Sequence, residues 1–304
     1  MAYMNTRKIL LTASAILLTA CSSNDASTAT DNAAEINLYS EVSTQTRAAN
    51  VAADLQDTQF AEGTEVMVMV TDNAETGTTI EYGLQAYTAD GLGGLTTALK
   101  QYYPPSGSTV RVCAWHPADA AEMFETATDQ RSTADYRRSD LMWATLPAID
   151  KNTPEEGRVL QFKHLFSKIL VRLYPGNGVT EEELAGATVT LGTDDLVTSG
   201  IFVADEGLFT AAASGTGTLL IATDAGVAVH AAVVVPQNMA GKKISVAVSG
   251  GLKGFAIPEG TVFEPGKRYT YSITVNKAEL MVTSAIEDWD DPEGWVDPDG
   301  HIKV

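Results

Sequence analysis

Cysteine is almost absent from this 304-residue chain, which has only Cys21 and Cys113. Two thiols cannot build the disulfide network that holds small secreted domains together, so the fold must depend on an apolar core. Bases are also scarce, because 20 lysines and arginines stand against 39 acidic residues and the formal net charge is −19. A surface this acidic repels phosphate backbones, which argues against nucleic acids as partners.

Signatures of catalysis and metal binding are missing as well. The four histidines (His116, His164, His230 and His301) do not have the spacing of metal ligands, and the sequence has no nucleophile elbow, phosphate loop or dinucleotide fingerprint. The acidic run 287–293 lacks the ligand spacing of an EF-hand loop, so we interpret it as a solvated loop. We therefore expect no cofactor, no metal and no enzymatic activity.

Long hydrophobic runs are lacking too. The apolar run Ile9–Ala20 follows Arg7 and Lys8 and is too short for a transmembrane helix, which needs roughly 20 residues. A basic segment, a short apolar run and small residues before a cleavage point are typical of an export signal. Residues 18–21, Leu-Thr-Ala-Cys, resemble a bacterial lipobox, in which the chain is cut before the cysteine and the thiol is acylated. An ordinary signal peptide followed by an unrelated cysteine is the alternative.

The lipobox interpretation predicts how the chain begins after export. Residues 1–20 would be the lipoprotein signal, Cys21 the lipidation site, and the small polar residues 21–34 a flexible tether. Ser22 after the cysteine fits delivery to the outer membrane of a Gram-negative bacterium. Loss of the two signal bases takes the formal charge from −19 to −21. The remaining thiol, Cys113, alternates with apolar residues and is expected to be a buried small hydrophobe.

Period-two alternation of apolar residues dominates the rest of the chain. Runs of five to seven such residues are separated by turns that contain Gly, Asp, Asn or Pro. We therefore predict an all-β protein built of antiparallel sandwiches. Only 95–102 and 181–184 suggest short helices. The strands are expected at 35–42, 65–71, 109–115, 168–174, 187–191, 218–221, 231–235, 244–248, 269–275 and 280–282.

The polar segment 150–157, which carries Pro154 and Gly157, suggests a boundary between two domains. It divides the chain into an N-terminal sandwich at 35–155 and a C-terminal sandwich at 156–304, both of ordinary domain size. A boundary at the Pro-Gly-Asn-Gly segment 175–178 is the alternative.

Five short phrases follow the lipobox along the chain, and they are Thr46-Arg47-Ala48, Ser139–Ala144, Phe162–Ile169, Phe263–Tyr269 and Ile286–Trp289. In their order and spacing, these phrases resemble the fimbrillin family of Bacteroidales, which contains pilus subunits and related surface lipoproteins. The resemblance implies two tandem transthyretin-like Greek-key β-sandwich domains and a structural role in a fimbrium, with adhesion as the outcome.

The resemblance also implies a processing step. An Arg-specific protease would cut between Arg47 and Ala48 and so excise the first strand, whose apolar residues are Ile36, Leu38 and Val42. An emptied strand position is a template for a strand from another chain, and head-to-tail filling gives a filament. The alternatives are that Arg47 is a solvated loop base, or that cleavage falls at 131, 137 or 138.

The C-terminal segment is a candidate donor strand, in which Trp295, Val296, Ile302 and Val304 would fill the groove of a neighbouring subunit. Pro298 and Gly300 interrupt this segment, and proline cannot donate a backbone hydrogen bond, so a loose surface tail is the alternative.

The expected function is therefore that of a pilus subunit in the stalk, tip or anchor, whose partners are other pilus subunits, the protease, and membrane lipid before processing. A non-polymerising surface adhesin or glycan-binding module is the alternative function. In that case exposed tryptophans such as Trp289 or Trp295 would stack on sugars.

Overall fold

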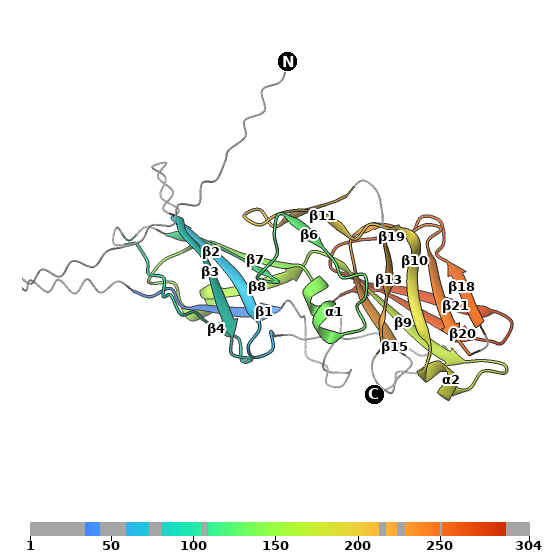
Figure 1. The fold of residues 1–304 in the computed structure, drawn as a ribbon. Coiled ribbons are helices and arrows are strands. Elements are labelled where there is room, and N and C mark those ends of the chain that lie inside the picture. The colour runs from blue at the N-terminus through green and yellow to red at the C-terminus, as the bar shows by residue number, and fades with distance from the viewer. Residues whose placement is uncertain are drawn as a thin grey trace, which may run out of the picture. The chain divides into compact units, whose positions relative to one another are not determined.

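The computed structural model describes residues 34–42, 59–72, 81–104, 107, 109–212, 217–223, 229–249 and 251–289. Strands predominate among these residues and helices are few and short, which confirms the prediction of an all-β protein (Figure 1). Among them, no helix has both the length and the apolar character needed to cross a bilayer.

Seven strands of the first half are joined by hydrogen bonds into one closed barrel. In order around the barrel the strands are β1 (Leu38–Val42), β4 (Gly94–Thr96), β3 (Glu81–Ala89), β2 (Glu65–Asp72), β5 (Val110–His116), β7 (Met142–Ile149) and β8 (Val159–His164). Strand β1 pairs with both β4 and β8, so the sheet closes on itself and leaves no free edge. The finer prediction of a Greek-key sandwich for this half stays a prediction.

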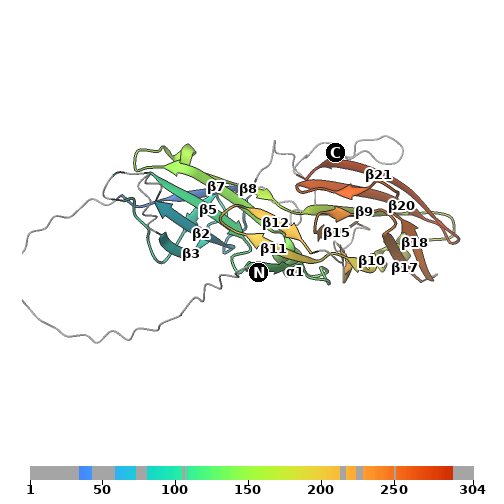
Figure 2. The ribbon, with the colours of Figure 1, turned by 90° about the horizontal axis from the view of Figure 1, so that it is seen from above.

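The second half contains two larger sheets that enclose an apolar core between them. The first sheet has the order β13 (Gly217–Leu220), β10 (Thr188–Leu196), β17 (Lys243–Val248) and β18 (Gly251–Ala256). The second has the order β14 (Ala222–Thr223), β15 (Val229–Val234), β9 (Ser167–Pro175), β20 (Lys267–Val275) and β21 (Leu280–Asp288). In Figure 2, β9, β20 and β21 of the second sheet lie side by side.

Smaller elements complete the described chain. They are the three-stranded sheet β12 (Leu208–Ala211), β11 (Ser199–Val203) and β6 (Met123–Glu125), the pair β16 (Gln237–Asn238) and β19 (Val262–Phe263), the helices α1 (Thr133–Ser139) and α2 (Glu181–Ala185), and the 3₁₀ helix Glu155–Arg158. A capping box between Thr180 and Glu183 starts α2, where a short helix was expected. The other expected helix, 95–102, is wrong, because its first residues are the end of β4 and the rest has no helical structure.

The domain boundary predicted at 155/156, with 175–178 as its alternative, stays a prediction. The segment 150–157 turns the chain from β7 into β8, and Thr153 donates its backbone N–H to the carbonyl of Asp150 over 3.0 Å within that turn. Since β8 pairs with β1 and β7, the barrel continues to His164, and β9 follows in a sheet of the second half.

The two halves share a third apolar cluster. Strand β6 of the first half pairs with β11 of the second, and Phe166, which lies between β8 and β9, is fully buried in the cluster beside the rings of Phe124 and Phe209. Trp143 of the barrel donates its indole N–H to the carbonyl of Ala204 over 2.8 Å. The barrel is thus fixed to the second half by packing and by strand pairing.

Candidate functional site

The first strand lies inside the barrel wall and not on its margin. Strand β1 runs antiparallel to β4, with Leu38 opposite Leu95, and parallel to β8, with Val42 opposite Phe162. A strand with neighbours on both sides has its backbone groups paired along both edges. Its loss would therefore open the barrel and leave two unpaired edges.

The sequence of this segment explains its place. Successive side chains of a strand point to opposite faces, and here the even-numbered positions face the core. Ile36, Leu38 and Val42 are 2%, 1% and 3% exposed and belong to the barrel core. Of the odd-numbered residues, Tyr39 is half-buried and Glu41 is exposed. The structure thus brings together the three apolar residues of the predicted excised strand, all on its inner face.

Residues before β1 continue the pairing. Ile36 donates its backbone N–H to the carbonyl of Gln101 over 2.8 Å, and Tyr103 donates to the carbonyl of Ala34 over 2.9 Å. Between them the carboxylate of Glu35 lies 2.7 Å from the ammonium of Lys100, an exposed pair that contributes little to stability. The segment 34–42 is therefore held along its whole length.

On β8, the residues beside β1 depend on it for their pairing. Residues 159–162 pair with β1, whereas the pairing of β8 with β7 in the described ladder is confined to Lys163 and His164. Leu160 and Phe162 in this stretch are fully buried in the barrel core. Removal of β1 would leave a slot lined by apolar side chains, with unsatisfied backbone donors and acceptors along it.

On the outside, polar contacts add to the hold on β1. Gln161 donates its side-chain N–H to the carboxylate of Glu41 over 2.8 Å. The guanidinium of Arg158 donates to the carbonyl of Asn37 over 3.3 Å and lies 5.8 Å from the centre of the Tyr39 ring. These contacts are exposed, so most of the free energy that retains β1 comes from its buried side chains.

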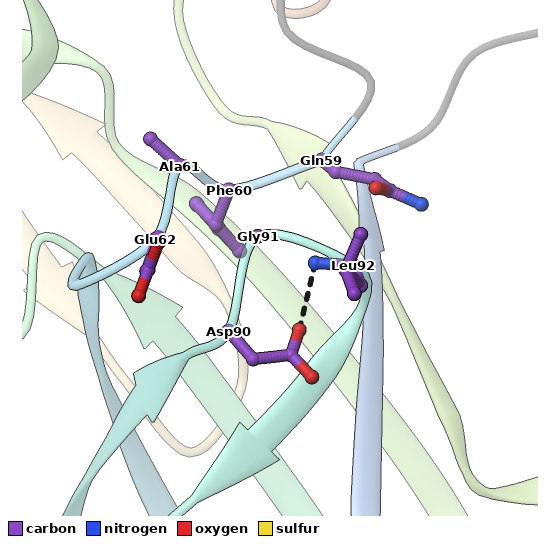
Figure 3. Close-up of a pocket in the computed structure, with 7 residues that line it drawn as sticks. All are labelled: Gln59, Phe60, Ala61, Glu62, Asp90, Gly91 and Leu92. Carbon is purple, nitrogen blue, oxygen red and sulfur yellow. Dashed lines mark hydrogen bonds between the residues drawn. The ribbon is translucent and has the colours of Figure 1, made fainter.

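An open hollow of about 590 Å³ lies next to the slot, at the turn between β3 and β4 (Figure 3). Of its two acidic residues, Glu62 and Asp90, the second accepts hydrogen bonds from the backbone N–H groups of Leu92 and Gly94 over 2.7 and 2.9 Å and so shapes the turn. No three His, Cys, Asp or Glu side chains in the described chain come together as metal ligands. The hollow is lined by Gln59, Phe60, Ala61, Glu62, Asp90, Gly91 and Leu92.

Other predicted site residues fall outside the part of the chain that the structure describes. They are the lipidation site Cys21, the processing residues Arg47 and Ala48, and the donor residues Trp295, Val296, Ile302 and Val304. The alternative cleavage points are described: Arg131 forms a two-point ion pair with Asp129, and Arg137 and Arg138 lie within α1.

Two residues with alternative roles are buried. Trp289 is 2% exposed and stacks on His164, with the ring centroids 4.0 Å apart, so its ring is not available to a sugar. Cys113 is 1% exposed, as expected for a small core residue, and burial raises the pKa of its thiol. A thiol that stays protonated is a poor nucleophile.

One feature of the site was not found in the sequence. Ser40 is 3% exposed and faces the barrel core between Leu38 and Val42. The alternation of the segment places position 40 inside, but a lone serine gives no signal that it meets the backbone of Gly93, which is 53 residues away in the sequence.

Comparisons with known proteins were made for the whole chain. A family model described as Fimbrillin-like matches residues 46–289. A curated protein of Bacteroides uniformis named "Putative fimbrium subunit Fim1C" is 27% identical over 209 residues, which cover 65% of this chain and 68% of that protein.

Solved structures give the same fold. A crystal structure of a "putative cell adhesion protein" from Bacteroides uniformis has a TM-score of 0.67 and 22% identity, over 86% of this chain and 99% of that one. A protein with the same description from Bacteroides ovatus has a TM-score of 0.63 and 18% identity, over the same shares of the two chains.

Proposed function

Because this chain belongs to the fimbrillin-like family, we propose that it is a structural subunit of a cell-surface pilus, assembled by exchange of its first strand for a strand of another subunit. The family supports the role of pilus subunit at the bacterial surface. The geometry of β1 supports the exchange, and adhesion would be the function of the finished filament.

The observation that carries the proposal is the double pairing of β1. A segment that fills a barrel wall, buries Ile36, Leu38 and Val42, and is the ladder partner of residues 159–162 leaves a strand-shaped slot when it departs. Another extended segment with apolar residues at alternate positions can refill the core and pair again with residues 159–162. The retained strand would keep the subunit monomeric until it is removed.

Cleavage between Arg47 and Ala48 would separate β1 from the rest of the chain. Arg47 follows the last residue of β1 by five positions, and the family match begins one residue before it. Six arginines of the described residues lie within strands or helices, where a protease would first have to unfold the backbone. They are Arg111, Arg137, Arg138, Arg158, Arg172 and Arg268, whereas Arg131 lies in the loop before α1.

The same cut would remove the lipid anchor. If Cys21 is acylated, cleavage at Arg47 releases the lipid and β1 together, so detachment from the outer membrane and readiness to polymerise become one event. The replacement strand is expected from 295–304 of a neighbouring subunit, and head-to-tail filling continues indefinitely. The finer assignment of the fold, two transthyretin-like Greek-key domains in tandem, is kept as part of this proposal.

The test is controlled cleavage of the exported chain with an Arg-specific protease, followed by N-terminal sequencing and electron microscopy. We expect a new N-terminus at Ala48 and filaments that form from the cleaved protein. An Arg47→Ala variant should stay intact and monomeric, whereas an Arg131→Ala variant should behave like the wild type. Cleaved protein that stays monomeric at high concentration, alone and with its natural partner subunits, would contradict the proposal.

A further inference from the structure

Ser40 is the exception among the residues of the first strand that face inward. The other three inward positions, 36, 38 and 42, hold apolar side chains, and all four are at most 3% exposed. The inner face of the segment therefore has the pattern apolar, apolar, small, apolar at every second residue.

The neighbours of Ser40 account for its size. On one side its partner in β8 is Leu160, which is fully buried. On the other side its backbone N–H and its hydroxyl both donate to the carbonyl of Gly93, over 2.7 and 3.5 Å. Gly93 has a φ of +104°, and a Cβ added there would lie 3.4 Å from the carbonyl oxygen of Ser40. The backbones meet closely at this point, so a long side chain at position 40 would displace Leu160 or the turn.

The pairing of β1 defines the frame into which a replacement strand would fit. Even-numbered residues turn their backbone N–H groups toward the β4 side, as Ile36 does to Gln101 and Ser40 does to Gly93. The strand runs parallel to β8. A replacement that keeps the direction of β1 has its inward residues in phase with positions 36, 38, 40 and 42.

Aligned in the direction of β1, the 15 residues that follow Trp289 contain this pattern in one register. When their sequence is shifted in this direction one residue at a time against positions 36, 38, 40 and 42, the set that gives apolar, apolar, small, apolar is Val296, Pro298, Gly300 and Ile302. All other registers place an acidic residue, a histidine or a lysine inside, or a large residue at position 40 or a glycine at an apolar position. In the matching register Asp297, Asp299 and His301 face outward.

We propose that the slot selects its strand by the small residue at position 40, and that the C-terminal segment of a second copy of this chain binds with Gly300 in the place of Ser40. The inference rests on the proposed function and adds the residue that sets its specificity. Pro298 would take the place of Leu38 and bring no N–H to the β4 side, so the donor is held chiefly by the ladder to β8.

Two leucine substitutions distinguish this register from a general requirement for small side chains in the C-terminal segment. After cleavage at Arg47, Gly300→Leu should reduce filament formation at least tenfold, because the leucine enters the narrow place beside Gly93. Asp299→Leu adds the same side chain one residue away, on the outward face, and should leave filament formation unchanged. Equal filament formation by the Gly300→Leu variant and the wild type would overturn the inference and leave strand exchange intact.

Disulfide trapping reads the register directly. Position 39 pairs with Val159, and in the proposed register Asp299 takes position 39. The chain that carries both Asp299→Cys and Val159→Cys should therefore form disulfide-linked dimers and larger covalent oligomers under mild oxidation. The pair Asp297→Cys and Val159→Cys is the control, since it lies two residues out of register and should not cross-link. Cross-linking of the control pair in place of the first would overturn the register.

A peptide measurement does not depend on the folding of any variant. The synthetic peptide 34–42 should compete with filament growth, and its Ser40→Gly form should compete equally well. Its Ser40→Leu form should compete at least tenfold less. If all three compete equally, position 40 does not select the strand. If the wild-type protein never forms filaments and never takes up the peptide, the proposed function fails, and this inference fails with it.

Discussion

The imidazole of His164 lies flat on the indole of Trp289, with ring centroids 4.0 Å apart and ring planes within 6° of parallel. Its Nδ1 is 2.8 Å from the carboxylate of Asp140, at the end of α1. His164 ends β8 and Trp289 follows β21 directly, so the stack joins the last barrel strand to the last described strand of the second half. Trp289 is further fixed by its backbone N–H, which donates to the carbonyl of Gly266 over 2.8 Å.

Substitution of this tryptophan should destabilise the fold. Trp289→Ala removes a large side chain that is 2% exposed, and we expect a loss of about 3 to 5 kcal/mol in the free energy of unfolding, measured in urea. Ile286→Ala on the same edge strand is the control, because Ile286 is 64% exposed and its removal should cost less than about 1 kcal/mol. Equal losses would contradict the role given to the stack.

Gly207 should not tolerate a side chain. Its φ is +65°, and an added Cβ would lie 2.3 Å from the ring of Trp143. Gly207→Ala should therefore lower stability by roughly 2 kcal/mol or more and change the fluorescence of the displaced indole. Gly260→Ala is the matched control: its φ is +79°, but nothing lies within 4 Å of the new Cβ, so it suffers backbone strain alone and should cost about 1 kcal/mol.

The hold on β1 should weaken when one of its buried residues is shortened. Leu38 is 1% exposed in the barrel core, and Leu38→Ala should cost about 3 kcal/mol in the intact chain. After cleavage at Arg47 the segment before the cut should dissociate faster than in the wild type, which size-exclusion chromatography with mass spectrometry can follow. Glu41→Ala, at an exposed position of the same strand, should dissociate nearly as slowly as the wild type. The same dissociation rate for both variants would argue against core burial as the source of retention.

Acid should destabilise the second half through His230. This residue is fully buried, and desolvation lowers its pKa to about 4, against about 6.5 in an unfolded chain. Between these values the unfolded chain binds a proton that the folded chain does not, so stability rises with pH through this window and this contribution is constant above it. The loss from pH 7 to pH 4 should approach about 3 kcal/mol. A His230→Leu variant should lose less stability over the same range, and an unchanged dependence on pH would exclude His230 as its source.

Local patterns in the sequence predicted the strands well, because the alternation of apolar and polar residues indicates which face of a strand is buried. The placement of Ile36, Leu38 and Val42 on one inner face followed from the same rule. The segment 150–157 shows a limit of composition as evidence, because a polar turn between neighbouring strands and a linker between domains have the same composition. The expected helix at 95–102 failed because Leu95 is fixed by pairing with Leu38, a contact that outweighs local preference.

Contacts between distant segments were beyond the reach of periodicity. Closure of the barrel depends on β1 meeting β8, about 120 residues later, and the pairing of β6 with β11 crosses between the halves. The role of Ser40 is of the same kind, since it is set by Gly93 and Leu160 and not by its sequence neighbours. Such positions emerge only when the partners on both sides are known.

The short connection between β8 and β9 has a mechanical consequence. Only Leu165 and Phe166 separate the two strands; the backbone N–H of Leu165 is bonded to the carbonyl of Leu141 over 2.8 Å, and Phe166 is fully buried. In a filament, tension on a strand seated beside β8 would pass through this connection into β9 and β20 with almost no slack. If the seated strand runs parallel to β8, as β1 does, the load would act along the ladder in shear, and its hydrogen bonds would have to break together and not one after another.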